Sequence, residues 1–217
     1  MTFLRITAFS VLLALSAPAH AESPIVSVTR VVGEVHEHFV TSREVRISDA
    51  IEQALDGKPA TPEGFRILSG TEKTFPSEVG RVLDQWIVYL EAKSLSNEPV
   101  GKAEVARGVG LVQEKWGGAK AWTELEVGSD ELKQMVELQL TARNFEKLKS
   151  DPQMTPVSDD DALTYYKKNR LRFGSLPFSS FKENIKSFLV KQQTERRLAE
   201  WHEILRRKYK VRNFISG

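Results

Sequence analysis

The sequence predicts a mainly α-helical protein with short β-structure near both ends. Two observations predict the helices. From Ser77 onward apolar residues recur every three or four positions, and capping or stop residues interrupt this pattern at several places. A third observation predicts strands, because β-branched residues are frequent within 24–40 and again within 211–215.

The first 21 residues have the pattern of a secretory signal peptide. Arg5 supplies a positive start, 6–15 is apolar, and Ala19-His20-Ala21 is a small-x-small cleavage site. The alternative is a membrane anchor, but about ten apolar residues are too few to span a bilayer. We therefore expect an exported, periplasmic protein that starts near Glu22, has no stable membrane insertion and, without cysteine, is stabilised by burial alone.

Charge is unevenly distributed along the chain. Residues 22–161 hold 16 Lys and Arg against 25 Asp and Glu, whereas 162–217 hold 14 against 4. A basic C-terminal third is typical of a nucleic-acid or lipid-headgroup surface, or of a basic helix that lies on an acidic body. Because an exported protein rarely meets nucleic acid, we expect no nucleic-acid partner and favour the packed helix.

The N-terminal part of the mature chain is expected to pass from β-structure into a helix. Valines and isoleucine flank Gly33-Glu34, so 24–40 is predicted to form a short two-stranded hairpin. Thr41 and Glu44 form an S/T-x-x-E capping box that begins a helix ending at Gly57. Residues 56–76 contain six Gly and Pro and are predicted to be an irregular loop.

Four further helices are predicted before the C-terminal segment. The spacing of apolar residues gives a long helix from Ser77 and a second one through Val105 to Trp116. A short segment with Trp122 and Leu125 follows. Two capped helices come next, with these signals: Ser129 before Asp130-Glu131, and Ser158 three residues before Asp161.

The last helix is predicted to be longer than the diameter of a small domain. It follows a short joint at 173–178, begins at a capping box of Ser180 and Glu183, and ends near Tyr209, which corresponds to about 45 Å. Its apolar positions thin out within 191–197. We expect the helix to pack at both ends and to bridge solvent or a partner in the middle.

Both flanks of this joint resemble the SurA family of periplasmic chaperones. The matching residues are Tyr165-Tyr166 with Arg172-Phe173 before the joint, and Leu176-Pro177-Phe178 with Ile185 and Leu189 after it. In that family a parvulin prolyl isomerase domain is inserted between such helices, whereas here the two ends meet. The order of hairpin and helices is similar to the family's N-terminal domain as well.

The resemblance implies a SurA-like helical chaperone core that lacks its enzyme. It implies an N-terminal helical domain over 22–157, completed by 158–217, with a small β-sheet formed by the N-terminal hairpin and the C-terminal strand. Prolyl isomerase activity is not expected, because the paired histidines and glycine-rich segment of a parvulin site are missing. No cofactor is implied.

Other chemistry has weak support in the sequence. Glu34, His36 and His38 alternate and would share one face of a strand, which permits metal binding, but solvated polar residues are the favoured interpretation. The Asp159-Asp160-Asp161 run lacks the Gly and Glu of a calcium loop, so helix capping explains it better. We therefore expect no metal and no catalytic residue.

Bulky side chains on the helices are the remaining candidates for binding. Aromatic residues and methionine give large, adaptable contact areas for apolar peptides, although most such residues belong to cores. Tyr89 and Trp122 are expected to face a cleft, because each lies off its helix stripe or at the stripe's edge. The candidate client-binding residues are Trp86, Tyr89, Trp116, Trp122, Tyr165 and Trp201.

The sequence thus predicts an ATP-independent periplasmic holdase. Its partners would be unfolded outer-membrane or other exported polypeptides, held by transient burial of their apolar segments. The alternative is a dedicated assembly or interaction factor that serves one exported partner.

Overall fold

The computed structural model describes residues 29–57, 72–95, 100–151, 154 and 156–215. These residues form a mainly helical fold with a small antiparallel sheet, as predicted. The predicted signal peptide and most of the predicted 56–76 loop lie outside them. In chain order the elements are β1 (Val31–Val35), β2 (His38–Thr41), α1 (Ser42–Leu55), α2 (Phe75–Leu95), α3 (Lys102–Trp116), α4 (Lys120–Thr123), α5 (Ser129–Lys149), α6 (Asp159–Lys168), α7 (Lys182–Lys208) and β3 (Arg212–Asn213).

The sheet joins the two ends of the described chain. Its order is β2-β1-β3, and Glu34 of β1 lies opposite both Phe39 and Arg212. The hairpin reverses at His36, whose φ of 55° is in the left-handed region, and not near Gly33. A side chain at Gly33 would approach Leu83 and the Arg212 carbonyl to about 3 Å, so glycine lets α2 and β3 pack closely here.

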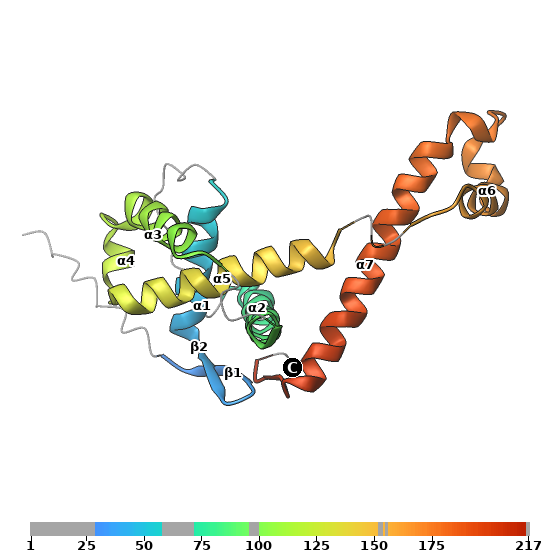
Figure 1. Ribbon diagram of the computed structural model, residues 1–217. Helices are drawn as coiled ribbons and strands as arrows, with labels where there is room; N and C mark the ends of the chain where they lie inside the picture. The colour runs from blue at the N-terminus through green and yellow to red at the C-terminus, as the bar shows by residue number, and fades with distance from the viewer. Residues whose placement is uncertain (1–28, 58–71, 96–99, 152–153, 155, 216–217) are drawn as a thin grey trace, which may run out of the picture.

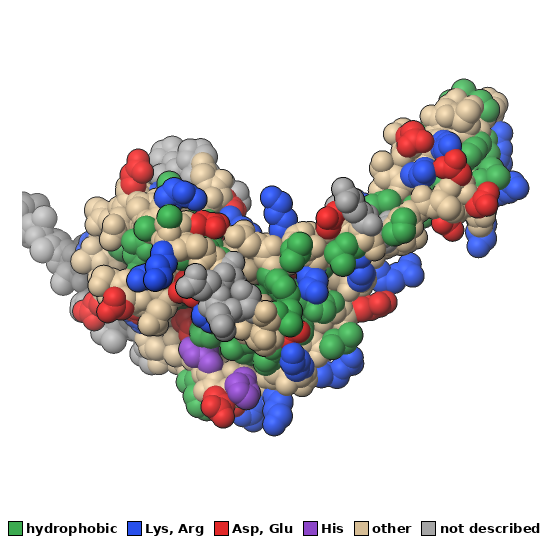
Figure 2. All heavy atoms as spheres, viewed as in Figure 1, with side chains coloured by type: hydrophobic (Ala, Val, Ile, Leu, Met, Phe, Trp, Pro, Cys, Tyr) green, Lys and Arg blue, Asp and Glu red, His purple; other side chains and the backbone are tan. Residues whose placement is uncertain are grey.

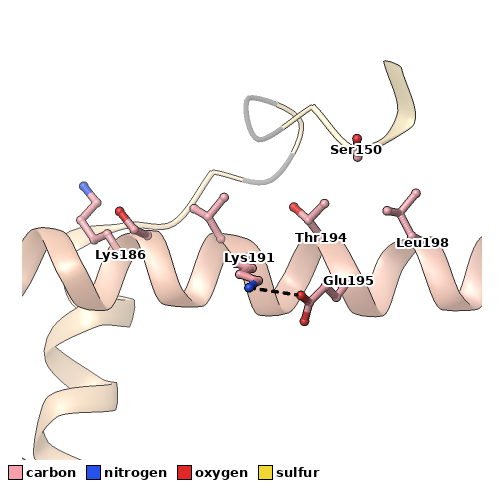
Figure 3. A pocket seen from close by; sticks show the side chains of 8 residues that line it. Ser150, Lys186, Lys191, Thr194, Glu195 and Leu198 are labelled. Atoms are coloured by element: carbon pink, nitrogen blue, oxygen red, sulfur yellow. Dashed lines mark ion pairs between the residues drawn. The ribbon is translucent and has the colours of Figure 1, made fainter. Parts of the chain in front are cut away.

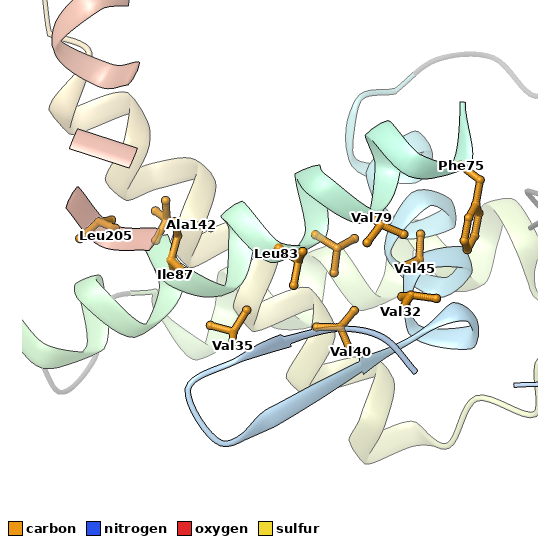
Figure 4. Packing of buried hydrophobic residues seen from close by; sticks show 12 residues of the cluster. Val32, Val35, Val40, Val45, Phe75, Val79, Leu83, Ile87, Ala142 and Leu205 are labelled. Carbon is orange, nitrogen blue, oxygen red and sulfur yellow. The ribbon is translucent and has the colours of Figure 1, made fainter. Parts of the chain in front are cut away.

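The main core lies between the sheet and α2. Figure 4 shows Leu83 and Ile87 of α2 above Val35 and Val40 of the hairpin, and these four side chains are at most 2% exposed. Each such side chain contributes about 1.5–3 kcal/mol of burial. Leu205, near the end of α7, joins the same cluster. The sheet therefore buries one face, and α7 helps to cover it.

A second core lies on the other side of α1. Ile47 and Ile51 of α1 pack with Val112 of α3 and Val136 of α5. Gly108 of α3 permits this contact, because a Cβ there would lie 2.7 Å from a Val136 methyl carbon. Helices α1 and α5 thus contribute to both cores and hold the body together (Figure 1).

Helix α7 extends away from this body and carries a third, smaller cluster (Figure 1). Ile185 and Leu189 in its first half pack against Ala162 and Tyr166 of α6. Its last turns pack on α2 through Leu205. The prediction that the long helix packs at both ends is confirmed. In its middle, the Arg197 guanidinium donates to the Lys149 carbonyl at 2.6 Å and the Met154 carbonyl at 2.9 Å.

Two helices begin at the capping residues that the sequence predicts. The Thr41 hydroxyl accepts from the Glu44 N–H at 3.1 Å, and Ser158 and Asp161 form the predicted reciprocal pair. The expected box at Ser180 and Glu183 is wrong, because 178–180 forms a 3-10 turn and α7 begins after Phe181 without a side-chain cap.

The start of α5 is displaced by one residue from the prediction. Gly128 is the N-cap and Ser129 is the first helical residue. None of the described helices has the length and apolar content needed to cross a membrane.

Candidate functional site

A groove of about 640 Å³ opens between β2, α2 and α5. We call it the Trp86 groove and define it by its apolar lining: Phe39, Trp86, Tyr89, Met135 and Leu138. Pockets of this size accommodate ligands of drug size, which corresponds to a few side chains of a polypeptide. The groove therefore suits a short apolar segment.

Ordinary helix and strand geometry places these side chains at the groove. Trp86 and Tyr89 are three residues apart on α2, and Met135 and Leu138 are three apart on α5, so each pair shares a helix edge. On β2 the neighbouring Val40 points into the core, which turns Phe39 outward and leaves it 56% exposed. The helix and strand periodicities that bury other side chains in the core thus also place these apolar side chains next to one another at the groove.

Trp86 is held in a fixed orientation by polar neighbours. Its indole N–H donates to the Glu44 carboxylate at 2.5 Å, and the His38 ring stacks on it with 4.0 Å between centroids. The His38 Nε2 atom lies 3.0 Å from the same carboxylate. Because the Trp86 ring is oriented before anything binds, little side-chain entropy remains to be lost there on binding.

The opposite side of the groove is charged and paired. The Arg43 guanidinium forms a bidentate ion pair with the Glu131 carboxylate and also donates to the Leu125 carbonyl at 2.8 Å. The hydrogen bonds from Arg43 lower the pKa of Glu131, so this carboxylate stays ionised. The groove lining therefore combines apolar side chains with a charged pair that is held in place by hydrogen bonds.

The structure brings together two of the six predicted binding residues. The rings of Trp86 and Tyr89 meet edge to face with 5.8 Å between centroids, and both side chains are half-buried. Tyr89 does line a cleft, as its position beside the helix stripe suggested.

Trp116 and Trp122 are buried in the second core. Trp116 is 3% exposed and its indole N–H donates to the Ala50 carbonyl at 2.8 Å. Trp122 is 9% exposed, so the expectation that it faces a cleft is wrong. The reason is tertiary: Trp122 joins a cluster formed by side chains of α1, α3 and α5, which a stripe on a single helix does not reveal.

Tyr165 and Trp201 lie apart from the groove. Tyr165 belongs to the α6 cluster, where its ring is 5.4 Å from that of Phe188. Trp201 packs on Phe145 where α7 passes α5, with 5.9 Å between centroids. The six aromatic candidates therefore do not form one surface.

Sequence reasoning missed several groove residues. Phe39 lies within the 24–40 segment that is predicted only to form a hairpin, although an outward phenylalanine next to a buried valine is a usable signal. His38, Arg43 and Leu138 reach the groove only through the packing of β2, α1 and α5, so no local pattern identifies them.

A second hollow of about 640 Å³ lies along the middle of α7. Figure 3 shows Thr194 and Leu198 of α7 pointing toward the segment that contains Ser150. It coincides with the stretch of α7 that is poor in apolar residues.

The suspected metal ligands do not converge. His36 lies in the hairpin turn, Glu34 pairs with Arg212, and His38 points to Glu44, so the three do not share a strand face. Asp159 pairs with Lys182 and Lys186. In the described ranges no three or more His, Cys, Asp or Glu side chains are grouped so that they could hold a metal ion.

Comparison with known proteins found no matching family model, no matching curated protein and no matching solved structure.

Proposed function

We propose that this protein is an ATP-independent periplasmic chaperone that holds unfolded outer-membrane or other exported polypeptides. The observation that carries the proposal is the Trp86 groove, a preformed apolar groove whose aromatic side chains are partly exposed. Methionine and aromatic side chains at such a site accept apolar segments of varied sequence.

The energetics of the groove suit reversible holding. Burial of one client Leu or Phe side chain contributes about 1.5–3 kcal/mol, and ordering of the client chain opposes this gain. One groove of this size is therefore expected to bind a segment weakly, so that release needs no nucleotide. Several such contacts along an unfolded chain would add avidity.

Two features of the sequence support a chaperone role in the periplasm. The signal-like 1–21 segment points to export, and the motifs around the 173–178 joint resemble SurA-type chaperones. The same groove would also serve a dedicated factor for one exported partner. The two functions differ in client range, which is directly measurable.

The test compares two phenylalanines of similar exposure near the same sheet. Phe39 lines the groove and is 56% exposed, whereas Phe214 is 49% exposed and is not part of the groove lining. We expect F39S to weaken binding of a fluorescent apolar peptide by about fivefold to tenfold, with Y89A similar. F214S should bind like the wild type.

Client range is measured by light scattering of several unrelated unfolded porins at near-stoichiometric ratio. A general holdase suppresses the aggregation of all of them and loses this effect in F39S. Suppression of one client only would identify a dedicated factor. Equal binding by F39S, Y89A, F214S and the wild type would show that the groove is not the client site.

A further inference from the structure

The end of the arm formed by α6 and α7 combines exposed apolar and basic side chains. We call it the arm tip and define it by Lys167, Lys168, Arg170, Leu171 and Arg172. Leu171 is 99% exposed, and all four cations are exposed. Figure 2 shows blue and green side chains at this end of the molecule, with red ones among them.

The backbone presents Leu171 in a fixed position. It lies in the 3-10 helix Arg170–Phe173, and Phe173 anchors this turn by packing 5.1 Å from the Tyr166 ring and 5.0 Å from the Phe181 ring, centroid to centroid. The Tyr166 hydroxyl donates to the Leu176 carbonyl at 2.6 Å on the other side of the joint. Leu171 is therefore held outward by a packed aromatic cluster.

The cations of the arm tip face no carboxylate. In the part of the chain that the structure describes, none of the four lies within 4.0 Å of an Asp or Glu oxygen. Arg170 donates to the Gly174 carbonyl and lies over the Tyr166 ring, and Arg172 donates to the Tyr165 hydroxyl at 3.2 Å, so both keep their full charge. The other end of α7 differs, because Arg206 pairs with Asp84 and Lys208 with Glu91. Within the basic C-terminal third, the cations that pair with carboxylates of α2 thus lie near the C-terminal end of α7.

Asp159, the first residue of α6, does not neutralise the arm tip. Asp159 begins α6, whose ten residues span about 15 Å, and Lys168 ends it. This separation exceeds the Debye length of about 8 Å at physiological ionic strength. Asp159 is in addition paired with Lys182 and Lys186.

We propose that the arm tip binds the surface of an anionic phospholipid bilayer, with Leu171 entering the interfacial region and the four cations facing the headgroups. Clustered Lys and Arg beside an exposed apolar side chain are the features that attract a protein to such a surface. The contact is peripheral and goes beyond client holding, because it would tether the body, with its Trp86 groove, to a membrane through the arm.

The shape of the arm tip favours a bilayer over an acidic protein. A stable protein interface buries about 800 Å² on each partner around a well-packed centre. Leu171 on its narrow turn and Leu176, which is 53% exposed in the joint that follows, offer no such centre, whereas a fluid interface adapts to them.

The experiment measures co-sedimentation of the mature chain with vesicles of phosphatidylglycerol and phosphatidylcholine, and with phosphatidylcholine alone. We expect binding to the anionic vesicles only, and weaker binding as salt is raised. The double variant K167Q/K168Q should weaken partitioning by more than tenfold, at about fivefold per cation. L171S should weaken it by about tenfold.

The chain offers a matched control for L171S. Leu148 is 62% exposed and lies between Lys147 and Lys149, but on the body at the end of α5. L148S should bind vesicles like the wild type, and circular dichroism should show that all variants remain folded, since the changed side chains are exposed.

Three results would overturn the proposal. The first is absence of vesicle binding, and the second is equal binding with and without phosphatidylglycerol. The third is retention of wild-type binding by both arm-tip variants. Capture of polyglutamate with no capture of vesicles would assign the arm tip to an acidic polypeptide instead.

Discussion

His202 joins three helices at the point where α7 leaves the body, and its protonation should control stability at alkaline pH. Its Nδ1 lies 3.8 Å from the Asp84 carboxylate of α2, and its Nε2 lies 3.0 Å from the Glu146 carboxylate of α5. Arg206 donates to the same Asp84 carboxylate at 2.6 and 2.8 Å. Replacing the imidazole by an uncharged amide in H202Q removes the charge and leaves the other ion pairs present.

The carboxylates of Asp84 and Glu146 raise the pKa of His202 from 6.5 to about 9. Burial alone would raise the pKa of Asp84, but the charge of the nearby His202 and the hydrogen bonds from Arg206 outweigh burial and lower it. Because the folded chain binds the His202 proton more tightly, its stabilising effect is complete below pH 6.5 and is lost as pH rises through about 9.

The size of the effect follows from this difference in pKa. A full shift would correspond to roughly 3 kcal/mol below pH 6.5. The Glu146 side chain is 46% exposed, so solvent screening reduces the Coulomb energy. We therefore expect a loss of about 1–2 kcal/mol in the free energy of unfolding between pH 6.5 and 9, attributable to His202.

Urea unfolding at pH 6, 7.5 and 9.5 measures this loss. The wild type should lose the predicted stability over the interval, whereas H202Q should start lower and stay nearly level. The exposed His36 provides a control, because H36Q should follow the wild type. Equal losses in H202Q and the wild type would refute the assignment of the alkaline transition to His202.

Two further predictions concern the second core. Ala at Gly108 would clash with a Val136 methyl group at 2.7 Å, so G108A should lose about 1–3 kcal/mol in urea unfolding, while G110A, on open helix surface, should gain up to about 1 kcal/mol. A loss in both, or in neither, would contradict the packing of α3 on α5. W116F should lose about 1–3 kcal/mol, because the buried Ala50 carbonyl loses its indole donor, and should keep peptide affinity. A fall in affinity without a fall in stability would instead place Trp116 in binding.

Local signals predicted the elements well, but one predicted capping box is wrong and one helix start is displaced by a residue. Thr41 and Ser158 cap the helices expected of them, because a cap depends on residues three positions apart. Ser180 matches the same pattern, but the turn after Pro177 takes it into a 3-10 helix. A capping pattern cannot show that another local turn competes for the same residue.

The candidate site was predicted only in part for a related reason. Tyr89 and Trp122 both lie at the edge of a stripe, yet one lines the groove and the other is core. Helical periodicity shows which residues share a face, and it does not show how many neighbours cover that face. Only the tertiary packing that puts Trp122 into the second core distinguishes the two residues.

By itself the sequence determined the mainly helical class, the hairpin, the long final helix and the split of charge, because each depends on residues close together in the chain. The packing of the elements sets which aromatic residues remain open, that β2, α2 and α5 line a groove, and that the basic third divides into an end paired with carboxylates and an arm tip whose four cations face none. These properties depend on contacts between residues up to 178 positions apart, such as Glu34 with Arg212. Long-range contacts of this kind are set by the packing of complete elements, which no local pattern specifies.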